Sequence, residues 1–234
     1  MKTSIVIPIY NERESIPSLI QRLKPACHTL APFEIICIDD GSTDGSLEVL
    51  LHEKQSCPEM KIIKFEANSG KSAALTAGFK EAKGEIVVIL DADLQNPPEF
   101  IPALVEKIAQ ADAVFGWRFD RKDSIAKKWA SRFANRFRSF FLKDHSHDSA
   151  CALNAFRREF LHDLPMFKGM HRFFPALMRM KNARVVEVKV PHEKRLYGIS
   201  KYGTFYRGIP AFFDLLAVLW MYKRKITYRI EKIL

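Results

Sequence analysis

Apolar residues recur along the first half of the chain in short runs, and the segments between them have helical spacing. The apolar, β-branched runs predict five strands, at Thr3–Ile9, Glu34–Ile38, Lys61–Phe65, Glu85–Leu90 and Ala113–Phe115. Helices are predicted between them, at Glu12–Leu30 (interrupted by Pro17 and Pro25), Asp44–Lys54, Gly70–Ala82 and Pro98–Gln110. Because the strands are apolar without alternation, we expect an α/β fold with a mostly parallel sheet and helices on both faces.

Polar residues follow three of these strands. They are Tyr10-Asn11-Glu12 after the first, Asp39-Asp40 after the second and Asp91-Ala92-Asp93 after the strand that ends at Leu90. Ligands of such sheets bind beyond the carboxyl ends of the strands. We therefore expect the three runs to converge on one site.

The second half of the chain is rich in aromatic and basic residues. Lys127–Leu142 and Phe205–Tyr222 are predicted helices, and Ala150–Phe156 and Arg184–Val190 are predicted strands. A polar loop, Lys194–Gly203, precedes the last helix. We expect one domain, in which residues 1–203 form the catalytic body and residues 204–234 an amphipathic, basic segment that associates with a membrane.

Charge is divided unevenly between the two halves. The chain carries a net charge of +10, but residues 1–116 hold 11 Lys and Arg against 17 Asp and Glu, and residues 117–234 hold 26 against 10. The acidic half is suited to hold a metal ion. The basic half is suited to phosphates, whether of a small ligand, a nucleic acid or an anionic membrane.

The compartment is predicted from cysteine spacing and hydropathy. The four cysteines show no C-x-x-C spacing, which is typical of a reduced, cytosolic chain. No run reaches the roughly 20 apolar residues that span a bilayer, and the best candidate, Ile209–Tyr222, contains Asp214. We expect a chain that lies on a membrane without crossing it.

Asp91 and Asp93 are the strongest candidates for chemistry. Two aspartates at i and i+2 after a buried strand can direct oxygen ligands at one Mg²⁺ or Mn²⁺, which would bridge a nucleotide diphosphate. The alternative is a solvated turn, but the two neighbouring polar strand ends favour the metal.

The other two strand ends are suited to bind a nucleoside. Asp39 can accept a hydrogen bond from a base or a ribose, while Ser42 or Thr43 caps the next helix. Tyr10 can stack on a base, and Glu12 can bond a ribose or a base edge. Taken alone, Tyr10 and Glu12 are better explained as a tyrosine at the cleft rim and a charge in the first helical turn.

These residues, taken as an ordered set, resemble a known family. Ser4-Ile-Val-Ile-Pro-Ile-Tyr-Asn-Glu12, Asp39-Asp40-Gly-Ser, Asp91-Ala-Asp-Leu-Gln95 and Gly116-Trp-Arg118 resemble the inverting family-2 glycosyltransferases of GT-A fold. Asp91 to Pro97, together with Arg195-Leu-Tyr-Gly-Ile-Ser-Lys201, is similar to the polyprenyl-phosphate sugar transferases typified by dolichyl-phosphate mannose synthase. The resemblance covers residues 3–222.

The resemblance implies a role for each matching position. Pro8, Tyr10, Glu12 and Asp39 would hold the nucleoside. Asp91, Ala92, Asp93 and Gln95 would line the metal and the diphosphate, with Asp93 and Gln95 as direct metal ligands.

The basic positions have implied roles as well. Arg118 would meet the sugar or the acceptor phosphate, and Arg195 and Lys201 would close over the donor diphosphate. Lys127 and Ser131 match positions that meet the lipid phosphate. The catalytic set is therefore predicted as Asp91, Asp93, Arg118, Arg195 and Lys201.

The implied reaction moves a sugar from a UDP- or GDP-sugar to a polyprenyl phosphate with inversion, because the phosphate oxygen attacks in line. A phosphate acceptor is already anionic, so the protein must chiefly supply cations that bring two negative groups together. The chain departs from the family's pattern at Asp148-Ser149-Ala150-Cys151, where glycine is common at position 150 or 151. This departure bears on the shape of the sugar pocket.

Two helices are candidates for membrane contact. Lys127–Leu142 carries Trp129 and four phenylalanines, surrounded by Arg132, Arg136, Arg138 and Lys143. Phe205–Tyr222 contains Trp220 and precedes the basic run Lys223-Arg224-Lys225. Both patterns suit an anionic membrane interface, and the alternative is ordinary core packing. We expect a protein peripheral on the inner, cytoplasmic face of the cell membrane, with a homo-oligomer or a membrane-protein partner as further options.

Other functions fit parts of the pattern. A transferase for a soluble glycan would not need the basic C-terminal half, and a nucleotidyltransferase would show a glycine-rich basic loop after the first strand. A nucleic-acid binder could use the same aromatic and basic residues, but Asp91 and Asp93 would repel its phosphates unless a metal is bound, so no nucleic acid is expected. A non-catalytic binder of nucleotide sugars is the last alternative.

Overall fold

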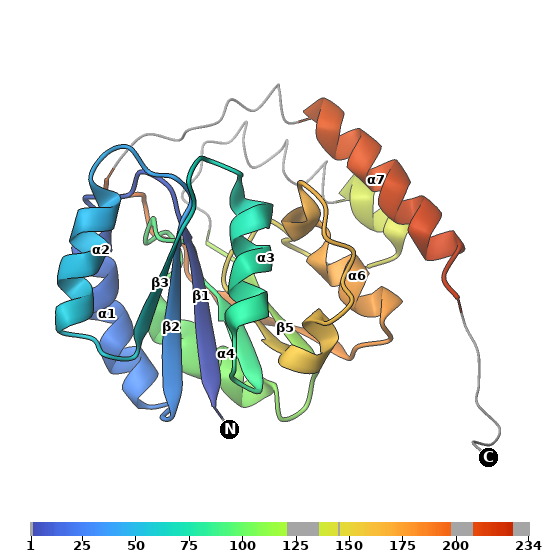
Figure 1. Ribbon diagram of the computed structural model, residues 1–234. Helices are drawn as coiled ribbons and strands as arrows, with labels where there is room; N and C mark the ends of the chain where they lie inside the picture. Colours follow the sequence, from blue (N-terminus) through green and yellow to red (C-terminus); the bar gives the residue numbers. More distant parts are fainter. Residues whose placement is uncertain (1, 121–135, 145, 198–207, 227–234) are drawn as a thin grey trace, which may run out of the picture.

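The computed structural model describes residues 2–120, 136–144, 146–197 and 208–226. Within these ranges the strands form one sheet in the order β3-β2-β1-β4-β6-β5-β7 (Figure 1). Their bounds are β1 Thr3–Ile9, β2 Phe33–Asp39, β3 Met60–Lys64, β4 Ile86–Ile89, β5 Ala113–Arg118, β6 Asn154–Arg157 and β7 Val185–Val190. All neighbours pair in parallel except β6, which is antiparallel to both β4 and β5. The predicted mostly parallel sheet is confirmed.

Helices cover both faces of this sheet. One face packs against α1 (Ile16–His28), α2 (Ser46–Gln55) and α4 (Ile101–Lys107), which follows the short helix η1 (Pro98–Phe100). The other packs against α3 (Lys71–Glu81), α6 (Phe174–Met180) and α7 (Gly208–Lys223), with the short helix η3 (Met170–Arg172) beside them. A further short helix, η2 (Arg158–Leu161), follows β6, and residues 136–142 are also helical.

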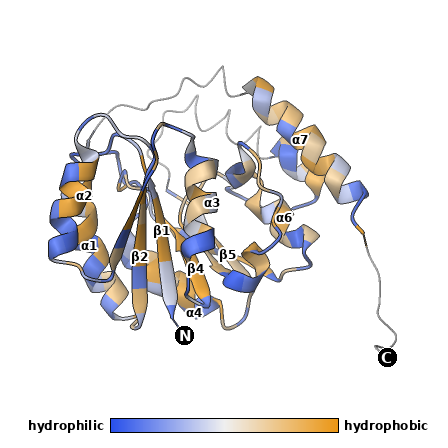
Figure 2. Cartoon of the chain, viewed as in Figure 1, coloured by the Kyte–Doolittle hydropathy of each residue, from blue (hydrophilic) through white to orange (hydrophobic). Residues whose placement is uncertain are grey.

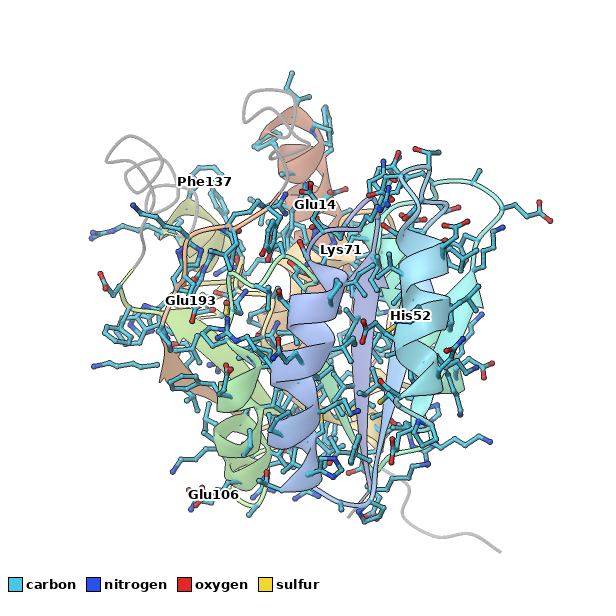
Figure 3. The ribbon with its side chains drawn as sticks, turned by 90° about the vertical axis from the view of Figure 1, so that its left-hand side faces the viewer. Glu14, His52, Lys71, Glu106, Phe137 and Glu193 are labelled. Atoms are coloured by element: carbon cyan, nitrogen blue, oxygen red, sulfur yellow. The ribbon has the colours of Figure 1, made fainter. Side chains whose placement is uncertain are left out.

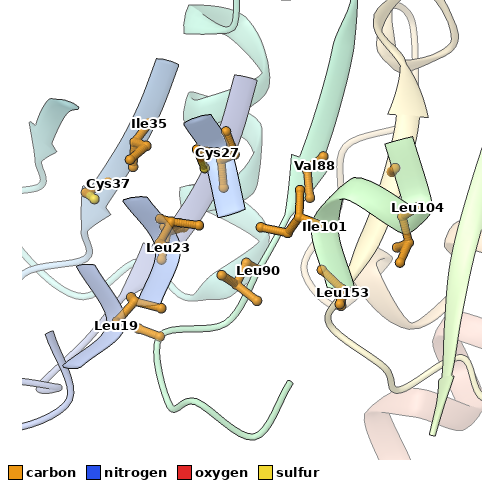
Figure 4. Packing of buried hydrophobic residues seen from close by; sticks show 14 of the residues in the cluster. Leu19, Leu23, Cys27, Ile35, Cys37, Val88, Leu90, Ile101, Leu104 and Leu153 are labelled. Atoms are coloured by element: carbon orange, nitrogen blue, oxygen red, sulfur yellow. The ribbon is translucent and has the colours of Figure 1, made fainter. Parts of the chain in front are cut away.

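Alternation along the central strands builds two apolar cores, one on each face. Ile5 and Ile7 of β1 point into the first core, and Val6 between them points into the second. Figure 4 shows the first core, where Leu19 and Leu23 of α1 approach β2 and β4. Colouring by hydropathy shows that the strands are apolar over most of their length (Figure 2). Burial on both faces explains why the strand sequences lack polar alternation.

Several element boundaries differ from the prediction. The predicted helix at Glu12–Leu30 begins only at Ile16 and runs through Pro25, because a proline removes one backbone bond without ending a helix that is packed along its face. Pro98–Gln110 divides into η1 and α4. The predicted strand Ala150–Phe156 begins at Asn154. Helix α6 was not predicted, since five of its seven residues are buried and leave no polar face.

Arg138 corrects one part of the predicted basic stripe. It does not lie among the exposed charges around the aromatic residues, because it is buried against the fully buried Asp144. Its Nε lies 3.2 Å from Asp144 Oδ2, and its Nη1 and Nη2 donate to the carbonyl oxygens of Arg172 and Ser146. Burial lowers the pKa of Arg138, and the charge of Asp144 opposes that shift. This ion pair therefore fastens the helix at 136–142 to the body.

Replacing Asp144 by alanine should lower the free energy of unfolding by about 3–5 kcal/mol, because it leaves the buried Arg138 charge without its paired carboxylate. Chemical denaturation measures the change. Arg184→Ala is the control, since it removes an exposed partner of Asp112 and should cost much less. Equal losses in the two variants would contradict a special contribution from the buried pair.

Candidate functional site

The three polar strand ends lie at one edge of the sheet, as predicted. β1 stands between β2 and β4, and the registers Ile9↔Asp39 and Val6↔Ile89 bring their carboxyl ends together. Contacts between the following loops confirm the convergence. The backbone N–H of Asn11 donates to Ser42 Oγ at 2.9 Å, and Arg195 reaches both Glu12 and Asp93.

Two cations neutralise the Asp91 and Asp93 carboxylates. Lys71 Nζ lies 2.5 Å from Asp91 Oδ1. Arg195 Nη2 lies 2.9 Å from Asp93 Oδ2 and 3.3 Å from Glu12 Oε1. Burial opposes the charge of Arg195, but the hydrogen bond to Asp93 and the charges of Asp93, Glu12 and Asp91 outweigh it and raise its pKa. Lys71 and Arg195 therefore face these carboxylates at the edge of the core.

Burial alternates along the loop after β4, and its polar residues are the more exposed ones. Ala92 and Leu94 are buried, whereas Asp91, Asp93 and Gln95 are half-buried. Leu94 adopts a left-handed backbone with φ 60°, and the N–H of Gln95 donates to Asp93 Oδ1 at 3.1 Å. Such a conformation is uncommon for leucine and is kept where the surroundings enforce it. The loop thus leaves side chains 91, 93 and 95 partly exposed while it buries Ala92 and Leu94.

Hydrogen bonds from the segment after β2 and from Ser15 hold the loop after β1. The N–H of Glu12 donates to Ser46 Oγ at 2.9 Å, and Ser15 Oγ donates to Glu12 Oε2 at 3.0 Å. Asn11, at φ 53°, accepts the Thr43 N–H at 2.8 Å. These bonds fix Glu12 where Arg195 meets it. Pro8 and Tyr10 are half-buried on either side of the last strand residue.

Asp39 is fully buried, and its two oxygens differ. Oδ1 accepts the Ser42 N–H at 3.2 Å, whereas Oδ2 is buried with no hydrogen-bond partner among the described residues. A buried acceptor without a donor is costly and suits a site that a ligand completes. The expected cap by Ser42 or Thr43 is wrong, because α2 begins after Gly45 and Ser46 instead bonds Asp44.

Asp40 has a role that the sequence pattern did not predict. Its carboxylate accepts the N–H groups of Ser69 and Gly70 at 2.7 and 2.9 Å and the side chain of Asn68 at 3.0 Å. Burial raises the pKa of Asp40, and the backbone bonds oppose that shift. Asp40 therefore holds the loop that leads into α3 and Lys71.

Lys71 itself was also missed. The signal available was a lysine in the first turn of a helix after Gly70, where the helix dipole disfavours a cation unless an acidic partner is near. Its partner Asp91 is 20 residues away in sequence, so only the fold brings the two together. In Figure 3, Lys71 and Glu14 lie at the same upper end of the molecule, opposite Glu106.

Arg118 lies on β5 and forms a bidentate ion pair. Its Nε and Nη2 donate to Asp148 Oδ2 and Oδ1 at 2.6 and 2.9 Å, and both side chains are largely buried. Residues 148–151, where the sequence departs from the family's pattern, therefore pack against β5. A Cβ at Gly116 would lie 2.7 Å from Cys151 Sγ, and burial raises the pKa of that thiol to about 12.

Three predicted site residues, Lys127, Ser131 and Lys201, lie outside the described residues. Of the remaining predicted positions, Arg195 joins Glu12 to Asp93. Asp91 pairs separately with Lys71, and Asp39 lies on the adjoining strand. Within the part of the chain that the structure describes, no three His, Cys, Asp or Glu side chains form a metal-binding group.

Comparison with known proteins identifies the family. Residues 4–164 match the profile of glycosyl transferase family 2. The chain belongs to this family, as the motif resemblance indicated.

Two similar curated proteins share the name undecaprenyl-phosphate 4-deoxy-4-formamido-L-arabinose transferase. The protein of Pseudomonas paraeruginosa is 39% identical over 92% of this chain and 64% of its own length. That of Pectobacterium carotovorum subsp. carotovorum is 42% identical over 92% of this chain and 67% of its own length. The chain thus spans about two thirds of these relatives. Its resemblance to polyprenyl-phosphate sugar transferases is confirmed.

Solved structures confirm the GT-A fold. Glucosyl-3-phosphoglycerate synthase from Mycobacterium tuberculosis, solved with Mn²⁺, UDP-glucose and phosphoglyceric acid, has a TM-score of 0.72 at 20% identity, over 94% of this chain and 80% of that one. The mannosyltransferase PcManGT from Pyrobaculum calidifontis, in complex with GDP-mannose and Mn²⁺, has a TM-score of 0.66 at 23% identity, over 98% and 65%.

Asp40→Asn should loosen the loop at residues 68–70, because the amide nitrogen replaces one of the two oxygens that accept its N–H groups. Hydrogen exchange at Ser69 or Gly70 should become about tenfold faster, as expected for the loss of roughly 1.4 kcal/mol of local stability. The Thr43 amide, bonded to Asn11, is the internal control. Unchanged exchange at both loop amides would contradict the role of Asp40.

Proposed function

We propose that this protein transfers a sugar from a nucleotide-sugar donor to a polyprenyl phosphate with inversion at the sugar carbon. The observation that carries the proposal is the joining of Asp91, Asp93 and Glu12 with Lys71 and Arg195 at the carboxyl ends of β1 and β4. Carboxylates that can bind a metal ion and cations that can bind phosphates are therefore in direct contact with one another. The relatives' name adds an acceptor, undecaprenyl phosphate, and a sugar to test first.

The residues present fit a divalent metal ion. The half-buried side chains of Asp91, Asp93 and Gln95 offer oxygen ligands from one loop, the donor type that Mg²⁺ and Mn²⁺ prefer. The scarcity of further protein ligands suits an ion that takes the rest of its ligands from a diphosphate and water. We propose Asp93 and Gln95 as its direct ligands and Asp91 beside them. When bound, the ion would neutralise charge on the departing diphosphate.

The chain's own residues would divide the remaining work. Tyr10 and Glu12, with Pro8 beside them, would hold the nucleoside, and the unpaired Oδ2 of Asp39 would accept a bond from its base or ribose. Arg195 and Lys71 would meet the diphosphate, with Lys201, six residues later in the sequence, as a further cation.

Arg118 would orient the sugar or the acceptor phosphate from β5. Asp148 fixes the plane of its guanidinium, and a planar donor in a fixed orientation suits a phosphate. Lys127 and Ser131 would complete the acceptor site. The attacking phosphate oxygen needs no strong base, so positioning and charge neutralisation would dominate the rate.

A transfer assay tests the reaction. Purified protein, a short polyprenyl phosphate, Mn²⁺ or Mg²⁺ and a panel of labelled UDP- and GDP-sugars are mixed, with nucleotide forms of 4-deoxy-4-formamido-L-arabinose included. We expect metal-dependent movement of one sugar into the organic phase. Asp93→Ala should reduce turnover at least about a hundredfold, because it removes a proposed metal ligand. Glu106→Ala, at the far end of α4, is the control and should leave turnover unchanged.

Undiminished turnover of the Asp93→Ala variant would overturn the metal assignment. Transfer to a soluble glycan but not to a lipid phosphate would favour the first alternative. Metal-dependent binding of a nucleotide sugar without any transfer would favour a non-catalytic binder.

The acceptor is a lipid, and α7 has a surface that suits its membrane. Leu215 and Val218 pack into the second core together with Leu142, whereas Phe213, Leu216 and Trp220 are exposed. Figure 2 shows α7 as mainly apolar. Asp214 faces inward, where its carboxylate lies 3.9 Å from Arg172 Nη1. No helix of the described residues is long and apolar enough to span a bilayer.

Exposed aromatic residues on the neighbouring helix extend this surface. Phe140 is 77% exposed, and its ring packs against that of Phe141, which in turn packs against Phe137. Exposure of this stripe favours an interfacial role over core packing. Lys223 and Arg224 at the end of α7 are also exposed. We propose that this surface docks peripherally on the anionic inner face of the membrane.

Replacing Phe213 and Trp220 together by serine should weaken binding to anionic phospholipid vesicles at least about tenfold, because two large rings no longer enter the interface. Vesicle sedimentation measures the binding. Leu51→Ser, which alters an exposed apolar residue on α2, is the control. Unchanged binding together with a change of oligomeric state would instead indicate a protein partner on this surface.

A further inference from the structure

Arg22 joins two segments that flank the carboxylates of the site. It lies on α1, and its Nε and Nη2 bond the Glu99 carboxylate at 2.8 and 2.9 Å. Its Nη1 and Nη2 bond the Glu193 carboxylate at 2.9 and 3.0 Å. The guanidinium therefore forms a bidentate pair with each of two carboxylates. In Figure 3, Glu193 lies beside the upper end of α4, next to α1.

Both partners of Arg22 are close in sequence to residues of the site. Glu99 lies in η1, four residues after Gln95. Glu193 lies two residues before Arg195, so their Cα atoms are at most about 7 Å apart. The N–H of Glu193 also donates to the Gln95 carbonyl oxygen at 3.0 Å. Arg22 thus links α1, η1 and the segment that carries Arg195, and the Glu193 N–H ties that segment to the loop at residues 91–95.

Stability alone does not account for this arrangement. The Glu99 and Glu193 side chains are 48% and 40% exposed, and ion pairs at such positions contribute little to folding. An arginine that bonds two carboxylates in bidentate fashion instead fixes their orientation, because the guanidinium group is planar and its N–H directions are rigid. The two hydrogen-bonded carboxylates also raise the pKa of Arg22, so its charge persists throughout the physiological range.

We propose that Arg22 is a positioning residue, which fixes Glu193 so that Arg195 is held beside Asp93 and Glu12 before any donor binds. The proposal rests on the proposed function in one respect, that Arg195 meets the donor diphosphate. A cation already in place loses less freedom when the ligand arrives, and donor use becomes more efficient.

Steady-state kinetics of the whole chain test this role. Arg22→Ala should lower kcat/KM for the donor about tenfold, and Arg22→Lys should not restore it, because lysine lacks the fork. Arg184→Ala is the matched control, since it also removes an arginine that bonds one carboxylate through two nitrogens, at the start of β7. It should leave kcat/KM unchanged.

A double-mutant cycle separates positioning from general stability. In an Arg195→Ala background, Arg22→Ala should cause no further loss, because Arg22 acts through Arg195. Additive losses would overturn the proposal, and so would an unchanged kcat/KM in the single variant.

Hydrogen exchange of the Glu193 amide tests the clamp without any substrate. Arg22→Ala should accelerate it about tenfold relative to the wild type and to Arg184→Ala. Unchanged exchange would overturn the proposal. If the wild type transfers no sugar, the proposed function fails, and this exchange experiment still decides whether Arg22 holds the segment.

Discussion

Charge compensation at one edge of the sheet is the constraint on which the rest of the site depends. Parallel pairing of β1 with β2 and β4 brings Glu12, Asp39, Asp91 and Asp93 to the same edge. Carboxylates brought together so close to a core are costly unless cations or hydrogen-bond donors face them. Lys71 and Arg195 supply the cations, and each comes from a distant part of the chain. Folding and the chemistry of the site therefore require the same contacts.

Much of this arrangement could be predicted from local sequence. Apolar runs that end in polar residues predicted the strands, their parallel pairing and the convergence of three loops, because strand periodicity and topology rules act over short distances. The positions of Asp40 and Lys71 could not be predicted. Asp40 holds a loop 28–30 residues away, and Lys71 bonds Asp91 20 residues away. Such contacts depend on how the loops pack, which composition and spacing do not specify.

The environment of the aromatic residues could not be predicted from the sequence either. Helical spacing of Phe137, Phe140 and Phe141 fits burial and membrane contact equally well, since both environments are apolar. Only the placement of the helix distinguishes them, and here it is fixed by the buried Arg138–Asp144 pair and Leu142. The sequence pattern placed Arg138 among the interfacial cations. In the structure it is buried and holds the helix in an orientation that leaves the three phenylalanines exposed.

The second half of the sheet gives the fold its asymmetry. Antiparallel β6 enters between β4 and β5, and the segment before it runs past the carboxyl end of β5. That path brings Asp148 to Arg118 and Cys151 to Gly116, where a larger residue at position 116 would collide. A sequence that departs from the family at positions 150 and 151 can therefore reshape the space beside Arg118 while the edge formed by β1, β2 and β4 stays intact. Under the proposed function, donor binding and acceptor or sugar selectivity would be carried by different parts of one sheet and would be free to change independently.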